Sequence, residues 1–63
     1  MTEFVFEIAI IHQNSNDTNW YTSRHFYKVK AVDVKSAFIS AVSRATDISN
    51  SYHHGEIKSI LRM

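Results

Sequence analysis

The side chains of this 63-residue chain that could do chemistry include four histidines, two of which, His53 and His54, are adjacent. Histidine is a common metal ligand, but neighbouring side chains of an extended chain point to opposite sides, so the pair chelates poorly. A zinc site needs three or four ligands, and only His12, His25 and nearby acids are left to supply them. Surface histidines without a metal are the favoured interpretation, and we predict no metal site.

Catalysis has little support in the remaining residues. There is no cysteine, no serine is flanked by glycines, and the single glycine excludes a glycine-rich phosphate loop. Glu7 and Glu56 could face each other across a sheet, but exposed ion pairs with Lys28 or Lys58 explain them better. A domain of this size also has little room for a deep pocket. We predict a protein that is not an enzyme and needs no cofactor.

The composition fits one small globular domain spanning residues 1–63. Hydrophobic residues make up 44% of the chain, and seven Lys and Arg nearly balance six Asp and Glu, for a net charge of +1. The longest apolar run, residues 8–11, is far too short to span a bilayer. The first residues lack the basic and then apolar pattern of a signal peptide. We expect a cytoplasmic protein that makes no contact with a membrane.

Alternating hydrophobic residues predict three strands. Residues 3–11 are apolar on both faces, which is typical of a central strand, and the polar run at residues 13–19 predicts a long hairpin loop. Residues 20–32 form the second strand, with Tyr21, His25, Tyr27, Val29 and Ala31 on its core face. Residues 56–63 form the last, with Ile57, Ser59, Leu61 and Met63 facing the core.

One helix is predicted between the second and last strands. Asp33 is placed to cap its start, because a carboxylate there accepts a hydrogen bond from a free backbone N–H group. An apolar stripe at helical spacing follows, made of Val34, Ala37, Phe38, Ala41, Val42 and Ala45. Residues 46–55 are expected to be a polar linker, with Ile48 and Tyr52 tucked against the edge of the core.

The predicted fold class is α+β, a three-stranded antiparallel sheet in the order 2-1-3 with one helix packed on one face. The alternative order 1-2-3 would need a parallel pair. It would also leave the most hydrophobic strand at an edge, where unpaired backbone groups promote aggregation.

The face that the helix leaves uncovered is the predicted binding surface. Unbroken alternation places there seven basic or apolar side chains of the outer strands, namely Arg24, Phe26, Lys28, Lys30, Lys58, Ile60 and Arg62. A positive surface with apolar residues suits a partner protein with an acidic surface. A charged outer face is also what solubility alone would select. A surface that serves only solubility is therefore the alternative to a binding surface.

Two other uses of this surface remain open. Trp20 and Phe26 could stack on bases while Arg24, Lys28 and Lys30 follow phosphates, which describes a single-stranded nucleic-acid-binding module. The chain could also be a homodimer, joined through the open face or along the second or third strand, rather than a monomer. The small net charge and the lack of a nucleic-acid-binding motif favour a protein partner.

The pattern from Tyr27 through the predicted Asp33 cap and the alanine-rich helix to residues 56–62 of the last predicted strand resembles small bacteriophage early proteins of the strand–strand–helix–strand type. The phage inhibitor of bacterial RNA polymerase belongs to this type. The resemblance implies a phage-encoded, non-catalytic monomer that docks on a host protein, such as RNA polymerase, and inhibits it. The docking residues that it implies are Arg24, Lys28, Lys30, Lys58 and Arg62. The long polar loop and the longer helix-to-strand linker depart from that pattern.

Overall fold

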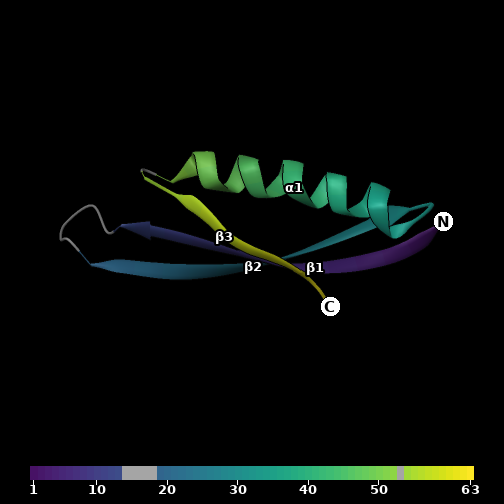
Figure 1. Cartoon of the computed structure of the whole chain (residues 1–63), viewed down its shortest axis with the longest axis horizontal. Coiled ribbons are helices and arrows are strands. Elements are labelled where there is room, and N and C mark those ends of the chain that lie inside the picture. Colours follow the sequence, from purple (N-terminus) through teal and green to yellow (C-terminus); the bar gives the residue numbers. More distant parts are fainter. Residues whose placement is uncertain (14–18, 53) are drawn as a thin grey trace.

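The fold is a twisted antiparallel sheet with a helix across one face, as the computed structural model of the chain shows (Figure 1). Within the described residues, which are all except 14–18 and 53, the sheet has the order β2-β1-β3. The predicted α+β class and strand order are therefore confirmed. Most of the predicted hairpin loop, and His53, lie outside the described residues. The elements are β1 (Thr2–Gln13), β2 (Trp20–Ala31), α1 (Val34–Ser51) and β3 (Glu56–Arg62).

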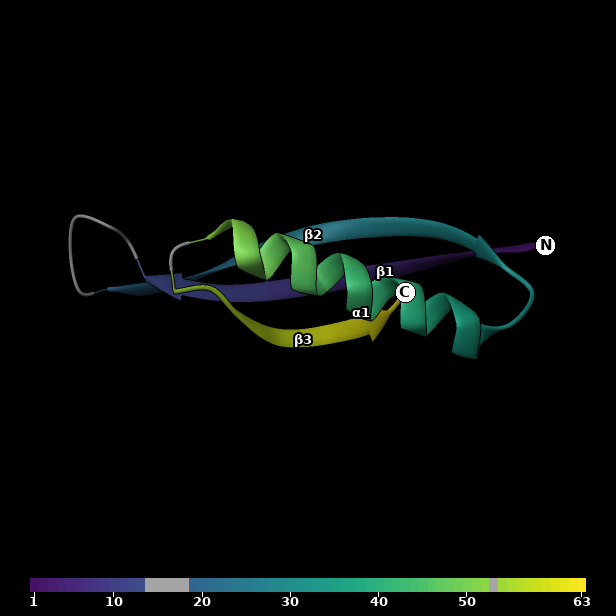
Figure 2. The ribbon, with the colours of Figure 1, turned by 90° about the horizontal axis from the view of Figure 1, so that it is seen from above.

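The core lies between β1 and α1. Phe6, Ile8 and Ile10 of β1 are almost completely buried, because β1 is paired on both sides and covered by the helix. Viewed from above, α1 runs diagonally across the strands (Figure 2). Tyr27 and Ile60 pack against both of the two adjoining hydrophobic clusters that result. The first core cluster consists of Phe4, Phe6, Ala31, Ala37 and Ala41, and the second of Ile8, Ile10 and Ala45.

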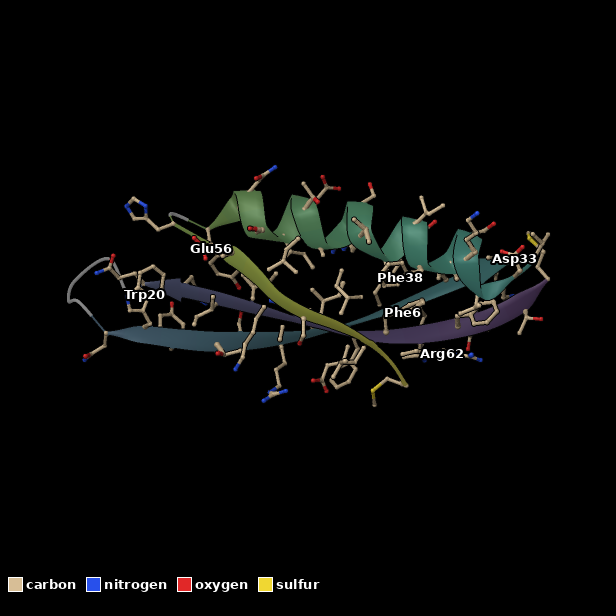
Figure 3. All side chains as sticks on the ribbon, viewed as in Figure 1. Phe6, Trp20, Asp33, Phe38, Glu56 and Arg62 are labelled. Atoms are coloured by element: carbon tan, nitrogen blue, oxygen red, sulfur yellow. The ribbon has the colours of Figure 1, made fainter. Side chains whose placement is uncertain are left out.

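Small residues let α1 lie close to the sheet. Ala37, Ala41 and Ala45 are fully buried and follow one another at four-residue intervals, which keeps them on one side of the helix. Phe38 lies beside this stripe with 45% of its surface exposed, and its ring centroid is 6.2 Å from that of Phe6 (Figure 3). Alanines therefore form the centre of the contact, and Phe38 closes one flank.

The helix extends further than predicted, to Ser51, so the assignment of residues 46–51 to a linker is wrong. Ile48 and Tyr52 pack against the second core cluster, as predicted. They extend the apolar stripe of the helix beyond Ala45. The Thr46 hydroxyl donates to the Val42 carbonyl at 3.0 Å, so this polar side chain is satisfied within the helix. Gly55 follows the helix at a point where a Cβ atom would lie 2.7 Å from the Ser49 carbonyl oxygen.

A bulge interrupts β3. The register pairs Ser59 with Ala9 but Ile57 with Ile10, so Lys58 is an extra residue between these two pairs. A bulge of this kind changes which face the following residues occupy. The prediction that alternation runs unbroken through this strand is therefore wrong beyond Lys58.

His12 is a buried polar residue near the C-terminal end of β1. Only 3% of its surface is exposed, and its ring lies 3.8 Å from the Tyr21 ring and 4.0 Å from the Tyr52 ring, centroid to centroid. Its Nε2 atom has no hydrogen-bond partner among the described residues. The stacked contact with Tyr52 and the edge-on contact with Tyr21 stabilise this end of the core, while the cost of burying the unpaired nitrogen lowers its stability.

We expect His12→Phe to raise the free energy of unfolding by about 1 kcal/mol, because it keeps the ring stacking and removes a buried nitrogen without a partner. Urea unfolding at neutral pH, followed by circular dichroism, measures the change. A lower unfolding midpoint than that of the natural chain would contradict this account of His12.

The helix cap generates a prediction about acid stability. Asp33 accepts a hydrogen bond from the Ser36 backbone N–H at 2.8 Å, and this bond lowers the pKa of the Asp33 carboxyl below its usual 3.8. The stabilisation is therefore fully present above the unfolded-state pKa and is lost as the pH falls through the lower folded-state pKa. Asp33→Asn keeps an acceptor that does not titrate. Between about pH 5 and about pH 2.5, its urea midpoint should fall less than that of the natural chain; equal falls would argue against the cap.

Candidate functional site

The candidate site begins with four side chains on one face of β2. Arg24, Phe26, Lys28 and Lys30 lie opposite Ala9, Glu7, Val5 and Glu3 of β1, and this register places them together on the face that α1 leaves open. All four are exposed, Phe26 with 64% of its surface. We call these four residues the β2 patch. The structure brings them together where the sequence placed them, and their role in binding remains a prediction.

Two of the three β3 residues of the predicted surface, Ile60 and Arg62, do not join the β2 patch. Ile60 lies opposite Ile8 and packs against both core clusters, so it belongs to the helix-covered face. Arg62 lies opposite Phe6 on that same face, with its guanidinium carbon 5.1 Å from the centroid of the Phe4 ring. Lys58 is the extra residue of the bulge. Placing Ile60 and Arg62 on the open face is therefore wrong, because the bulge reverses the alternation.

Leu61 takes the place on the open face that was predicted for Ile60. It lies opposite Glu7 with 56% of its surface exposed, and Phe26 lies opposite Glu7 from the other side. The open face therefore has a cross-strand row in which a carboxylate is flanked by two exposed hydrophobic side chains. Leu61 was not among the predicted surface residues, because nothing in the alternating pattern marks the extra residue at Lys58.

The charges on the open face are balanced and segregated. Arg24, Lys28 and Lys30 lie on β2, while the register places Glu3, Glu7 and Glu56 on β1 and β3. Arg24 Nη1 donates to Glu7 Oε1 at 2.7 Å, so this cation is already compensated. The excess of positive charge on this face is smaller than predicted, because Arg62 lies on the helix-covered face and Glu3 lies opposite Lys30. The positive charge lies along one margin of the sheet, with Lys28 opposite the uncharged Val5.

A polar cluster lies on the other face, where the end of α1 meets β2. Ser23 Oγ lies 3.1 Å from His25 Nε2 and donates to the Tyr52 hydroxyl at 3.4 Å. Such a serine–histidine contact can activate a nucleophile when a third group orients the imidazole. Within the described residues, the hydrogen-bond partners of the His25 ring are the neutral hydroxyl groups of Ser23 and Tyr52. The cluster is best explained as a tie between the strand and the helix end.

Other kinds of site find no support in the part of the chain that the structure describes. No three His, Asp or Glu residues there lie close enough to hold a metal ion, and no helix there is both long and apolar enough to cross a membrane. No protein-family model, curated protein or solved structure matches the chain. Functional inference therefore depends on the geometry of the β2 patch and its surroundings.

The bulge can be tested by comparing two neighbouring residues. Ile60→Ala should lower the free energy of unfolding by about 1–2 kcal/mol, because Ile60 packs against the core while partly exposed. Leu61→Ala should change it by about 0.5 kcal/mol or less, because Leu61 lies on the open face. Urea unfolding measures both. If Leu61→Ala lowered the free energy of unfolding more than Ile60→Ala, Leu61 and not Ile60 would face the core. That result would contradict the register with the bulge.

Proposed function

We propose that this chain is a non-enzymatic binding domain that docks on an acidic surface of another protein through the β2 patch. The observation that carries the proposal is the exposure of Phe26 beside Lys28 and Lys30 on a sheet face that no helix covers within the described residues. Interfaces commonly combine a desolvated aromatic anchor with charges that set the register of the complex.

Each residue of the β2 patch has a distinct role in this proposal. Lys28 and Lys30 attract an acidic partner and speed its approach through long-range electrostatics. Phe26 is the anchor that loses its contact with water, and Leu61 extends the apolar contact across the sheet. The ion pair with Glu7 holds the Arg24 side chain in position, so Arg24 loses less conformational freedom on binding.

The resemblance to phage early proteins supplies a biological role for such docking. On that basis we propose a phage-encoded inhibitor that acts in the host cytoplasm and covers a working surface of a host protein, with RNA polymerase as the first candidate. Inhibition would then follow from occlusion, without any chemical step. The set of docking residues differs from the one that the resemblance implied, because Arg62 contacts Phe4 on the helix-covered face.

Single-stranded nucleic acid is the second candidate partner. Trp20 is exposed and shares the open face with the β2 patch, so two aromatic rings and three cations lie on one face of one strand. Stacking on such rings and ion pairing with phosphates is a known mode of single-strand binding. The carboxylates of Glu3, Glu7 and Glu56 on the same sheet face would repel phosphates, so a protein partner is favoured.

We expect the double variant Lys28→Glu/Lys30→Glu to lose about tenfold or more of partner capture, because it replaces attraction by repulsion at the proposed contact. The measurement is affinity capture from a bacterial lysate, with quantitative mass spectrometry of the eluted proteins. Equal capture by the double variant and the natural chain would refute the proposal.

The matched control is Lys35→Glu/Arg44→Glu, which makes the same change of net charge at exposed positions of α1. It should capture the same proteins as the natural chain, and circular dichroism should show both variants folded. Titration of labelled oligothymidine at two salt concentrations separates the second candidate. Micromolar binding that weakens steeply with salt would favour nucleic acid over protein.

A further inference from the structure

We propose that the β2 patch captures an extended acidic segment of its partner protein, which adds to the sheet as a fourth strand along the outer edge of β2. This inference rests on the proposed function, because it names the structure and chemistry of the partner that the same patch binds. Strand addition to a free sheet edge is a general mode of recognition, in which main-chain hydrogen bonds give affinity and side chains give specificity.

The outer edge of β2 is long and open. β2 is twelve residues long and terminates the sheet, with β1 on its inner side. Seen from above, β2 forms one margin of the sheet, and no element of the described chain lies beyond it (Figure 2). Its outward N–H and C=O groups are therefore available to another strand.

One hydrogen bond shows which β2 residues point their backbone groups outward. The Met63 N–H donates to the Val5 carbonyl at 2.8 Å, so the backbone groups of Val5 face β3. Along a strand, successive residues direct their backbone groups to alternate sides, so Phe4 and Phe6 face β2. Their partners Val29 and Tyr27 therefore face β1.

It follows that the intervening residues of β2 direct their backbone N–H and C=O groups to the free edge. These are the residues of the β2 patch, namely Arg24, Phe26, Lys28 and Lys30. The same four residues thus offer main-chain hydrogen bonds along the edge and basic or aromatic side chains on the open face. A strand hydrogen-bonded to them would place its own opposing side chains on that face.

The side chains of the β2 patch specify what such a segment carries. Lys28 lies opposite the uncharged Val5, so a carboxylate on an added strand would be the first charged residue directly opposite it. Lys30 has Glu3 opposite it on β1 and can take a second carboxylate, while Phe26 favours an apolar residue. Arg24 is already paired with Glu7. The predicted segment therefore carries acidic, acidic and apolar residues at alternate positions.

The same charges argue against a second copy of this chain at the edge. Antiparallel pairing of two β2 strands about Phe26 would place Arg24 of each copy opposite Lys28 of the other, and like charges directly opposite each other are destabilising. Lysines on an edge strand are a common means of preventing self-association. Here they reject a copy and select an acidic strand.

The experiment measures binding of two peptides to the natural chain by fluorescence polarisation. One has the sequence Thr-Glu-Thr-Glu-Thr-Phe-Thr, and the other is its reverse, so that antiparallel and parallel addition are both tested. At least one should bind, and replacing its glutamates by lysines should weaken binding about tenfold or more. Absence of binding by both peptides would overturn the inference, and so would equal binding of the lysine version.

Methylation of the peptide backbone provides the matched control. If the first peptide binds, in the antiparallel direction, N-methyl groups on its two glutamates block N–H groups that face β2, and affinity should fall about tenfold or more. In the antiparallel case, N-methyl groups on the two threonines that precede the glutamates leave the N–H groups that face β2 intact, and affinity should stay within about twofold. If the reverse peptide binds, in the parallel direction, the threonine N–H groups face β2 instead, and the expected effects of the two methylated forms are exchanged. Equal effects would overturn strand addition. The proposed docking would survive that result if charge reversal at Lys28 and Lys30 still abolished lysate capture.

Discussion

The structure depends on one constraint, which is that β1 must be paired along both of its edges. Its side chains are apolar on both faces, and Phe6, Ile8 and Ile10 are almost completely buried. A strand of this kind at the edge of a sheet would expose hydrophobic surface together with unpaired backbone groups. The hairpin brings β2 to one side, and α1 carries the chain back so that β3 can pair with the other side. The strand order, the position of the helix and the free outer edges of β2 and β3 all follow.

A chain of this length has one amphipathic helix available in its described part, so one face of the sheet stays open. The hydrophobic residues on that face are not gathered into a continuous patch, because charged side chains alternate with them along β2 and across the row through Glu7. The net charge of +1 hides the separation of three cations on β2 from three carboxylates on β1 and β3. This separation would fix the orientation of a partner, because an acidic part of its surface would be attracted to the β2 side of the face and not to the β1 and β3 side.

The parts of the fold that local patterns determine could be predicted from the sequence. The double-sided apolar pattern of β1, the alternation in β2 and the carboxylate of Asp33 each depend on neighbouring residues, and the structure confirms all three. The bulge at Lys58 could not be predicted, because it depends on how β3 meets β1 in space, and one extra residue moved Ile60 and Arg62 away from the expected surface. The ion pair between Arg24 and Glu7 joins positions distant in sequence, so it also needed the register.

The lysines of β2 can serve both solubility and recognition, two explanations that need not compete. An edge of twelve residues with outward backbone groups invites pairing with any extended chain. Positive side chains on the residues whose backbone groups are exposed make that pairing unfavourable for a basic strand, including another copy of this one. They make it favourable for an acidic strand, because the repulsion is replaced by charge pairing at the same positions. A feature that protects the edge is therefore also able to select its partner, and selection for one does not exclude selection for the other.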